Sequence, residues 1–432
     1  MFAYYLDLAR RSLARNVGLT VLMIAAIAFG VGASMTTLTV LHVLAADPIP
    51  EKSHDLYTVQ LEPRKLLGLQ AGGEPPDQLT RLDAETLLRA GKAEHQAIMT
   101  GGEAAIEPQR PDLPPFYVDG RWTSTDFFKM FQAPFVAGTS WREDDDLHAA
   151  RVVVIARELA DKLFGSLDVI GKAIRVEGTD LRIIGVLDAW RPQPHFYDLF
   201  TSTFGKSELL FVPWSTAREM KLGHAGSVDC WDENPDTLAV NAPCVWIQYW
   251  VELHGEERVA AYRAYLEHYS EEQHRIGRFE RPPNVRLRDV MAWLEYRKVV
   301  PSDVRLQTWI ALGFLIVCLI NTVGLLLTKF LRRSSEIGVR RALGASRQAI
   351  FAQLLVEAGA IGLVGGAIGL GLAWLGLWAV RHQPTSYAEL AQLDLPMLAA
   401  TFGLSIITSL LAGVLPAWRG CQVTPAIQLK SH

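Results

Sequence analysis

Four long apolar runs constrain this chain more than any other feature of its sequence. They cover residues 17–46, 304–328, 350–380 and 395–418. Each reaches the roughly 20 apolar residues that a helix needs to cross a hydrocarbon core of about 30 Å. Because lipid offers the backbone no hydrogen-bond partners, such segments must be helical. The sequence therefore predicts a membrane protein with four transmembrane α-helices.

The first apolar run has some features of a cleaved signal peptide. Three arginines, Arg10, Arg11 and Arg15, precede it, and small residues lie near its end. However, its apolar stretch is about twice the 7–15 residues typical of a signal peptide. We interpret it as a retained membrane helix.

The distribution of lysine and arginine predicts the orientation, because these residues favour the cytoplasmic side of short loops. They gather before the first run, between the second and third runs, and after the fourth run. We therefore expect residues 1–16, 329–349 and 419–432 to be cytoplasmic. Residues 47–303 and the short loop 381–394, in which Arg381 is the only such residue, are expected on the opposite side.

The large block 47–303 has the composition of a water-exposed domain with mixed α/β structure. A helical pattern ending at Gly165 follows the first of its strand-like runs, and residues 255–275 have the pattern of an amphipathic surface helix. The last two strand-like runs are separated by a Gly-Thr-Asp turn, which is typical of a hairpin. The three runs are 151–156, 173–178 and 181–187. The predicted fold is thus four transmembrane helices with this domain inserted between the first and second.

Composition and motifs argue against several classes of function. The net charge of -4 does not suit a nucleic-acid-binding protein. The chain contains neither a His-Glu-x-x-His zinc motif nor a Gly-x-Ser-x-Gly nucleophile motif. Gly205-Lys206-Ser207 resembles the end of a phosphate-binding loop, but Phe200 stands where that loop requires glycine. We expect no catalytic site, no metal site and no ATP hydrolysis by this chain.

Two groups of residues in the inserted block could in principle bind a metal ion. The acidic run 143–146 could hold a cation, although a solvated acidic turn is the more common reason for such a run. His268 and His274 are six residues apart on a charged helix, which favours a solvated face.

The cysteines divide between the membrane segments and the inserted block. Cys230 and Cys244 are the two in the inserted block, and we expect a disulfide between them on the oxidising side of the membrane. The alternative is a pair of buried, unpaired thiols. Cys318 and Cys421 are expected to be free.

The third apolar run is rich in glycine. Gly362 and Gly366, like Gly365 and Gly369, have the small-xxx-small spacing that allows two helix backbones to approach closely. This spacing fits packing within one subunit and a dimer seam equally well. Glu357 is the one acidic residue in the run, and a carboxylate in a membrane normally has a partner.

Residues 334–346, SSEIGVRRALGAS, form a short basic segment between the second and third apolar runs. Ser334 or Ser335 could cap a helix with Glu336 in its first turn, and Gly344 could end it. Arginines alone would be enough to set orientation. The added acid, apolar residues and glycines instead indicate a defined surface that meets another protein.

At this segment the chain resembles the ABC-transporter permeases of the MacB/LolC/FtsX superfamily, the mechanotransmission or type VII class. That family has a Glu-Ile-Gly-x-basic-basic-Ala-Leu/Met-Gly-Ala core before a glycine-rich third span. The block 47–303 is similar to the periplasmic core domain of MacB-type permeases. The matching residues, expected to contact the ATPase, are Glu336, Ile337, Gly338, Arg340, Arg341, Ala342, Leu343 and Gly344.

The resemblance implies a permease subunit in the bacterial inner membrane, with residues 47–303 periplasmic and 329–349 docking on a separate ABC ATPase. ATP and Mg²⁺ would then be bound by the ATPase, and this chain would need no cofactor. A second permease, identical or paralogous, would complete a dimer, with a periplasmic adaptor and an outer-membrane conduit as further partners. The work done would be export or extraction of a substrate. The alternative is an FtsX-like signalling subunit that regulates a periplasmic cell-wall hydrolase.

Overall fold

The computed structural model describes residues 12, 16–68, 72–233, 235–384, 387–392 and 394–422. The chain divides into two compact units. We call the first the helical unit; it combines Met1–Ala45 with Val300–His432. We call the second the inserted unit; it spans Ala46–Val299.

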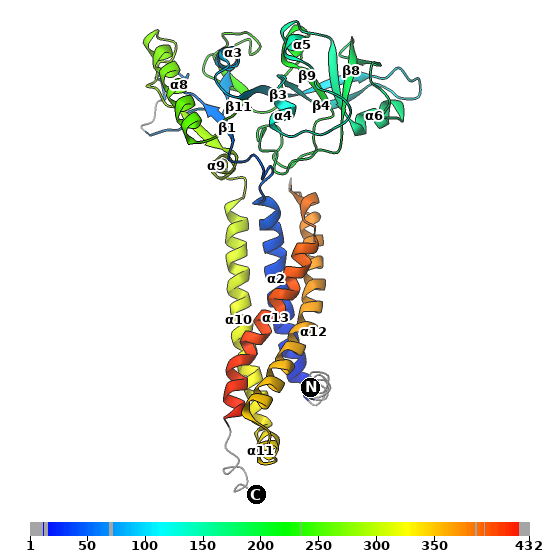
Figure 1. The fold of residues 1–432 in the computed structure, drawn as a ribbon, viewed down its shortest axis with the longest axis vertical. Helices are drawn as coiled ribbons and strands as arrows, with labels where there is room; N and C mark the ends of the chain where they lie inside the picture. The colour runs from blue at the N-terminus through cyan, green and yellow to red at the C-terminus, as the bar shows by residue number, and fades with distance from the viewer. Residues whose placement is uncertain are drawn as a thin grey trace. The chain divides into compact units, whose positions relative to one another are not determined.

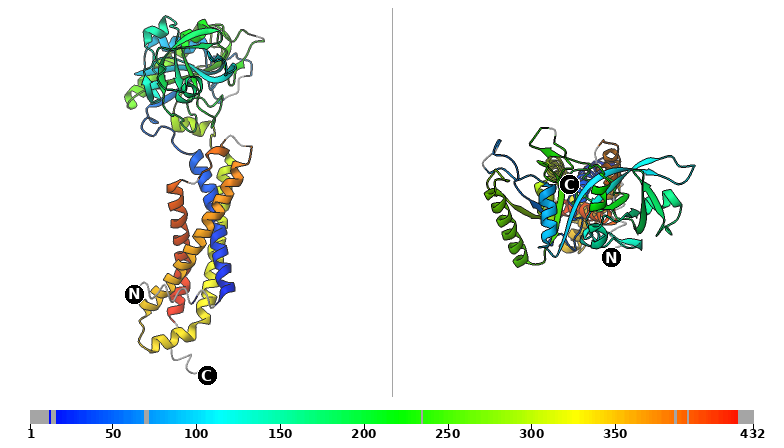
Figure 2. Two further views of the ribbon diagram at one scale, coloured as in Figure 1. Left: turned by 90° about the vertical axis from the view of Figure 1, so that its right-hand side faces the viewer. Right: turned by 90° about the horizontal axis from the view of Figure 1, so that it is seen from above.

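The helical unit is built from long apolar helices that run side by side (Figures 1 and 2). In the described part of the chain, four helices are long and apolar enough to cross a membrane. Helix α12 contacts α2 and α13, and α10 contacts the same two helices, so that the four form a bundle. The elements are α2 (Val17–Leu44), α10 (Ser302–Arg332), α11 (Ser334–Ala342), α12 (Arg347–Arg381), the 3₁₀ turn η1 (Ala388–Leu390) and α13 (Leu395–Cys421).

The junction between α10 and α11 differs from the prediction in two respects. Helix α10 continues through Lys329–Arg332, which had been expected to belong to the segment between the spans. Helix α11 begins at Ser334, so that only Arg333 separates it from α10. The carbonyl of Arg333 accepts a hydrogen bond from Ile337 N at 3.0 Å. The prediction that Ser334 or Ser335 caps α11 is wrong, because Arg333 occupies the cap position and makes no side-chain cap.

The inserted unit contains a mixed sheet, which confirms the predicted α/β unit between the first two long apolar helices. Its described strands follow the order β12-β1-β11-β3-β4-β9-β6-β8-β5, with β2 and β10 beside β11 and β7 bridging β3 and β8. Pairs β4–β9 and β6–β8 are parallel. The strands are β1 (Leu56–Gln60), β2 (Leu79–Thr80), β3 (His95–Glu107), β4 (Phe116–Thr123), β5 (Phe135–Gly138), β6 (Val152–Ala156), β7 (Ala173–Val176), β8 (Thr179–Leu187), β9 (Leu210–Pro213), β10 (Asp229–Cys230), β11 (Cys244–Glu252) and β12 (Arg286–Asp289).

Helices of the inserted unit pack on this sheet. The predicted helix after β6 is present and ends at Gly165, whose φ of 63° lies in the left-handed region that glycine adopts readily. The predicted surface helix is α8, which buries one face through Tyr262, Leu266 and Tyr269. The helices are α3 (Arg81–Ala90), α4 (Phe127–Met130), α5 (Glu143–Leu147), α6 (Arg157–Phe164), α7 (Trp214–Glu219), α8 (Glu256–Arg275) and α9 (Val290–Tyr296).

The hairpin of β7 and β8 is present, but its turn is shorter than predicted. Val176 pairs with Thr179, so the turn consists of Glu177 and Gly178, and Asp180 already belongs to the strand. Both turn residues have positive φ, 47° and 73°. That conformation matches the right-handed twist of the two strands, which explains why the two-residue turn forms.

The core of the inserted unit centres on β11. All nine residues of this strand are buried, because it pairs on both edges and is covered on its faces. Strand β7, which pairs with β3 and β8, instead alternates exposed and buried residues. This difference follows from the two-residue period of strands and from how many faces are covered.

Candidate functional site

Helix α11 has one face toward the helical unit and one face toward solvent. Ile337 is 7% exposed and belongs to the core of the unit, and Gly338 is also buried. On the opposite face, Val339 is 55% exposed and Leu343 is 84% exposed. The described part of α11 therefore presents apolar side chains that its own unit does not cover.

The predicted docking residues divide between these two faces. Ala342, Leu343 and Gly344 are exposed. Arg340 instead lies within the chain's own contacts, since its guanidinium donates to Glu336 at 3.0 Å and to Gln353 at 3.2 Å. The partly buried residues of the motif thus shape and anchor the helix, and the exposed ones form its outer surface.

Arg341 connects α11 to the end of α13. Its Nη1 donates to the carbonyl of Cys421 at 3.4 Å. Gly344, two residues after the end of α11, has a φ of 101°. Such a value is costly for a residue with a side chain, so glycine allows the chain to turn here toward α12. Ser346 then caps α12 by accepting a hydrogen bond from Ala349 N at 3.1 Å.

Behind α11 lies a buried cluster of charges centred on Glu357 of α12. The Glu357 side chain is 1% exposed, and Lys329 of α10, which is 0% exposed, places its Nζ 2.7 Å from Oε1. Arg333 places Nη1 3.1 Å from Oε2 of the same carboxylate. Ser12 also donates to Glu357 and accepts from Arg333 Nη1 at 2.6 Å. One carboxylate therefore holds two cations.

Arg333 extends this cluster into α11. Its Nη2 lies 3.1 Å from Oε1 of Glu336 in the first turn of that helix. The same Glu336 oxygen lies 3.0 Å from Arg340. A continuous path of ion pairs consequently runs from α12 through the end of α10 to α11. This path links the three helices through charged side chains.

The first of the predicted glycine pairs packs against α13 of the same chain. A Cβ on Gly366 would lie 2.5 Å from Ser405 Oγ, and a Cβ on Gly362 would overlap the Ser409 side chain. The Ser405 hydroxyl also donates to the Gly362 carbonyl. These glycines allow the two helices to approach closely.

The second glycine pair packs against α2. A Cβ on Gly365 would lie 2.9 Å from Ile27 Cγ2, and a Cβ on Gly369 would lie 3.2 Å from the Ala28 carbonyl oxygen. Of the two interpretations left open by the sequence, packing within one subunit is the one that these contacts support.

Neither metal-binding pattern considered from the sequence gathers ligands. The acidic run 143–146 forms α5, in which Asp145 accepts a hydrogen bond from Arg142 N at 2.9 Å and Asp146 is buried. His274 Nδ1 lies 2.8 Å from the carbonyl of Phe279. Within the described residues, no group of three or more His, Cys, Asp or Glu side chains could hold a metal ion.

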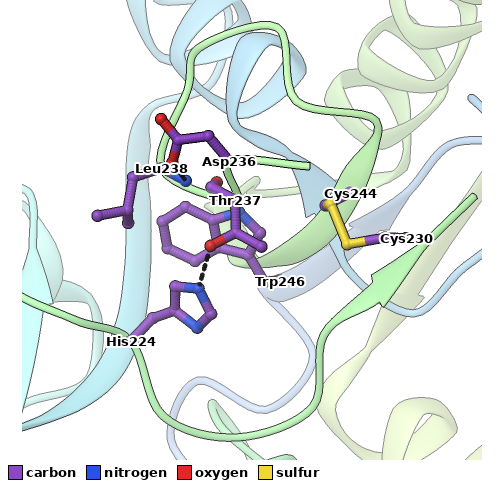
Figure 3. Close-up of a disulfide and its surroundings, with 7 residues drawn as sticks. All are labelled: His224, Cys230, Asp236, Thr237, Leu238, Cys244 and Trp246. Carbon is purple, nitrogen blue, oxygen red and sulfur yellow. Dashed lines mark hydrogen bonds between the residues drawn. A yellow bond between two sulfur atoms is a disulfide. The ribbon is translucent and has the colours of Figure 1, made fainter. Parts of the chain in front are cut away.

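Cys230 and Cys244 are joined by a disulfide between β10 and β11, where they stand opposite each other (Figure 3). The loop between them folds against Trp246, whose Nε1 donates to the Thr237 carbonyl at 3.1 Å. The His224 ring stacks on the Trp246 ring, with 4.5 Å between the ring centroids. His224 Nε2 lies 3.1 Å from Thr237 Oγ1. The disulfide therefore closes a loop that also has its own packing.

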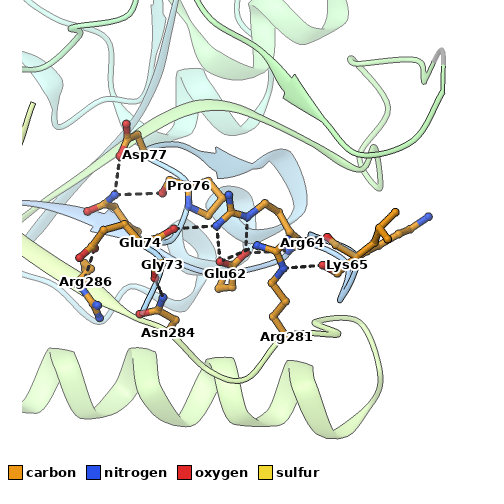
Figure 4. A network of polar contacts seen from close by, with 12 residues as sticks. Glu62, Arg64, Lys65, Gly73, Glu74, Pro76, Asp77, Arg281, Asn284 and Arg286 are labelled. Atoms are coloured by element: carbon orange, nitrogen blue, oxygen red, sulfur yellow. Dashed lines mark hydrogen bonds and ion pairs between the residues drawn. The ribbon is translucent and has the colours of Figure 1, made fainter. Parts of the chain in front are cut away.

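A network rich in arginine holds the loop after β1 (Figure 4). Arg64 Nε donates to Glu62 at 2.7 Å, and Arg281, which is buried, lies 3.5 Å from the same carboxylate. Arg286 Nε donates to Glu74 at 3.0 Å. These contacts between arginines and carboxylates anchor the loop.

Lys329 and Arg333 have roles that were not predicted from the sequence. Both had been interpreted only as orientation signals, yet both are ion-paired to Glu357. The one available signal was Glu357 itself, since a carboxylate in an apolar run requires a partner. Identifying that partner requires knowing which faces of α10 and α12 meet.

Two models of known protein families match the sequence of this chain. Residues 20–269 match the model of the MacB-like periplasmic core domain, and residues 309–425 match that of the FtsX-like permease C-terminal region. The chain belongs to the MacB/FtsX superfamily of ABC-transporter permeases. This assignment confirms the resemblance seen in the sequence.

Several relatives of this permease have names that describe export proteins. It is 24% identical over 350 residues to the macrolide export ATP-binding/permease protein MacB of Syntrophobacter fumaroxidans, covering 71% of this chain and 46% of that protein. It is 25% identical over 336 residues to the pyoverdine export ATP-binding/permease protein PvdT of Pseudomonas aeruginosa, covering 77% of this chain and 45% of that protein. The chain thus spans about half the length of the curated relatives it matches.

Among solved structures, the permease is similar to the periplasmic region of MacB from Actinobacillus actinomycetemcomitans. The TM-score is 0.38 with 12% sequence identity, over 59% of this chain and 97% of that one.

Proposed function

We propose that this chain is the permease subunit of an ABC exporter and converts ATP binding and hydrolysis by an ATPase subunit into movement of the inserted unit. The proposal is supported by the family assignment over both units and by the export function in the names of the relatives. ATP and Mg²⁺ belong to the ATPase, and this chain contributes no catalytic residue. The work is mechanical and drives export or extraction of a substrate.

The observation that carries the proposal is the exposed apolar surface of α11. Val339 lies uncovered on a nine-residue helix whose other face is anchored by ion pairs, and Leu343 lies uncovered at the residue that follows this helix. Apolar residues surrounded by charged ones are typical of a protein interface. This surface is the element that docks on the ATPase.

In this proposal the chain lies in the bacterial inner membrane with both termini and α11 in the cytoplasm and the inserted unit in the periplasm. The arginines and lysines that precede α2 and surround α11 support this orientation. A disulfide in the inserted unit suits the oxidising periplasm.

A second permease, identical or paralogous, completes the proposed transporter, and a periplasmic adaptor with an outer-membrane conduit receives the substrate. The alternative, FtsX-like regulation of a cell-wall hydrolase, uses the same cytoplasmic coupling. The MacB-like match over 250 residues, 20–269, favours export. Co-purification of an adaptor supports export, whereas a bound hydrolase activator supports regulation.

The docking role is tested by charge placed on the exposed surface of α11. Val339→Glu and Leu343→Glu, combined in the affinity-tagged full chain, should abolish capture of ATP-hydrolysing protein from native membranes without reducing membrane insertion. Gln383→Glu, which adds one negative charge beyond the other end of α12, should leave capture unchanged. Undiminished capture by the double variant would overturn the docking role.

These two positions give a cleaner test than the arginines of the segment. Replacing Arg340 and Arg341 with glutamate is also expected to abolish capture. However, Arg340 contacts Glu336 within the chain, so its loss disturbs α11 itself. Val339 and Leu343 are exposed, so their replacement acts on the surface alone.

A further inference from the structure

Glu357 is buried where a charge is costly. Its side chain is 1% exposed, on a helix long and apolar enough to cross a membrane. Removing a carboxylate from water costs several kcal/mol unless it is paired and hydrogen-bonded. In this chain Lys329, Arg333 and Ser12 all contact it, so it is fully engaged.

The position of the contacts is more informative than their number. Lys329 belongs to α10, Glu357 to α12, and Arg333 is the single residue between α10 and α11. Arg333 contacts both Glu357 and Glu336, and Glu336 is in α11. Glu357 thus pairs directly with Lys329 of α10 and with Arg333, and it is linked to Glu336 of α11 through Arg333.

We propose that Glu357 is a positioning residue that ties α11 to the transmembrane helices, so that displacement of α11 moves α10 and α12 together. This inference depends on the proposed docking of α11 on an ATPase and specifies how the displacement is transmitted. The Lys329–Glu357 pair is buried and Arg333 is 14% exposed, so separating these side chains would leave buried charge unpaired. The network therefore acts as a rigid joint.

A proton-relay role fits the site less well. The third apolar run contains no other acidic residue and no histidine that could pass a proton onward. The carboxylate oxygens are occupied by two cations and a hydroxyl. Such a carboxylate is held in place instead of being free to exchange a proton.

The joint is tested by amide hydrogen exchange of the full chain in detergent. Glu357→Gln keeps the shape of the side chain and removes its charge. We expect exchange in residues 334–342 to become at least about tenfold faster, because hydrogen bonds to charged groups are lost. Arg332→Gln removes an exposed charge beside the cluster and should leave exchange unchanged. Exchange within twofold of wild type in Glu357→Gln would overturn the inference.

Two further variants keep the test decisive if Glu357→Gln fails to accumulate. Glu336→Gln breaks the α11 end of the path while preserving the Lys329–Glu357 pair, and it should also accelerate exchange in α11. Glu357→Asp retains the charge and should restore most of the protection. Unchanged exchange in Glu336→Gln would contradict the joint just as directly.

A coupling measurement separates this role from simple support of the fold. In complexes captured from native membranes, ATP with orthovanadate should alter hydrogen exchange of the inserted unit in the wild type. Complexes that form with Glu357→Gln, compared with wild type at equal amounts of captured ATPase and equal ATP hydrolysis, should lose this response. If the response persists in Glu357→Gln, the inference fails while docking stands. If Val339→Glu/Leu343→Glu still captures the ATPase, the docking proposal fails instead.

Discussion

In the inserted unit, the guanidinium of Arg121 lies 2.8 Å from the carboxylate of Asp198, and both side chains are 1% exposed. Arg121 Nε also donates to Glu208 at 3.0 Å, and Tyr197 donates to the other oxygen of Glu208 at 2.9 Å. Arg121 comes from β4, whereas its partners lie between β8 and β9. This ion cluster therefore attaches a long connection to the sheet.

Removing the arginine should strongly destabilise the inserted unit. Arg121→Met leaves Asp198 and Glu208 buried without their cation, and breaking a buried ion pair in this way costs about 3–5 kcal/mol. Denaturation of the full chain in detergent, followed by tryptophan fluorescence, measures the loss. Arg175→Met removes the ion pair between Arg175 and Glu107, in which both side chains are about half exposed. This change should lower the free energy of unfolding by less than about 1 kcal/mol. Equal losses in the two variants would show that burial does not set the strength of this cluster.

A second prediction concerns pH and Asp146. Burial raises the pKa of Asp146 to about 6, although hydrogen bonds from Ser215 act in the opposite direction. The folded state therefore retains a proton between about pH 4 and pH 6 that the unfolded state releases, so this group makes the protein less stable as pH rises through that window. The loss amounts to at most about 3 kcal/mol.

Asp146→Asn should remove this loss, because the amide oxygen can still accept the hydrogen bond from Ser215 N and carries no charge. Unfolding free energies measured at pH 4, 5, 6 and 7 should fall less steeply between pH 4 and 6 in the variant. Asp161→Asn, at an exposed position of α6, should keep the wild-type profile. An unchanged slope in Asp146→Asn would show that this carboxyl titrates normally in the folded protein.

Local patterns made much of the fold predictable from the sequence. The four long helices follow from apolar runs, and the helix ending at Gly165 follows from spacing and a C-terminal glycine. The shortened turn at Glu177 and Gly178 was less accessible, because Thr179 and Asp180, which are typical of turns, pair as strand residues here. Patterns within one element can be recognised, whereas its exact limits depend on its neighbours.

The candidate site was predictable only in part, for the same physical reason. The motif around Glu336 marked α11 as important, but which of its residues point outward depends on packing against α10, α12 and α13. The pairing of Lys329 with Glu357 joins residues on two helices, and helix rotation decides it. A sequence shows that Glu357 needs a cation; it does not show which of the nearby basic residues supplies it.

The disulfide supplies a third prediction. Non-reducing peptide mapping of the full chain should recover Cys230 and Cys244 as one linked peptide pair, with Cys318 and Cys421 as free thiols. Replacing both Cys230 and Cys244 with serine should cost about 3 kcal/mol, the value expected for a loop of this length. Cys421→Ser is the control and should leave stability unchanged. Recovery of Cys230 and Cys244 as separately alkylated peptides would contradict the bond.

The last prediction separates glycines of α12 that face another helix from those that do not. Gly362→Ala places a methyl group against Ser409 of α13, so the helices must separate or the serine must move, at a cost of about 1–3 kcal/mol. A Cβ on Gly371 meets nothing within 4 Å, and Gly371→Ala should be neutral or stabilise the helix by up to about 1 kcal/mol. Thermal unfolding of the two variants in detergent, read by size-exclusion chromatography after heating, compares them directly. Equal midpoints would mean that α12 and α13 do not pack through Gly362, and the close approach of these helices would then have to be attributed to other contacts.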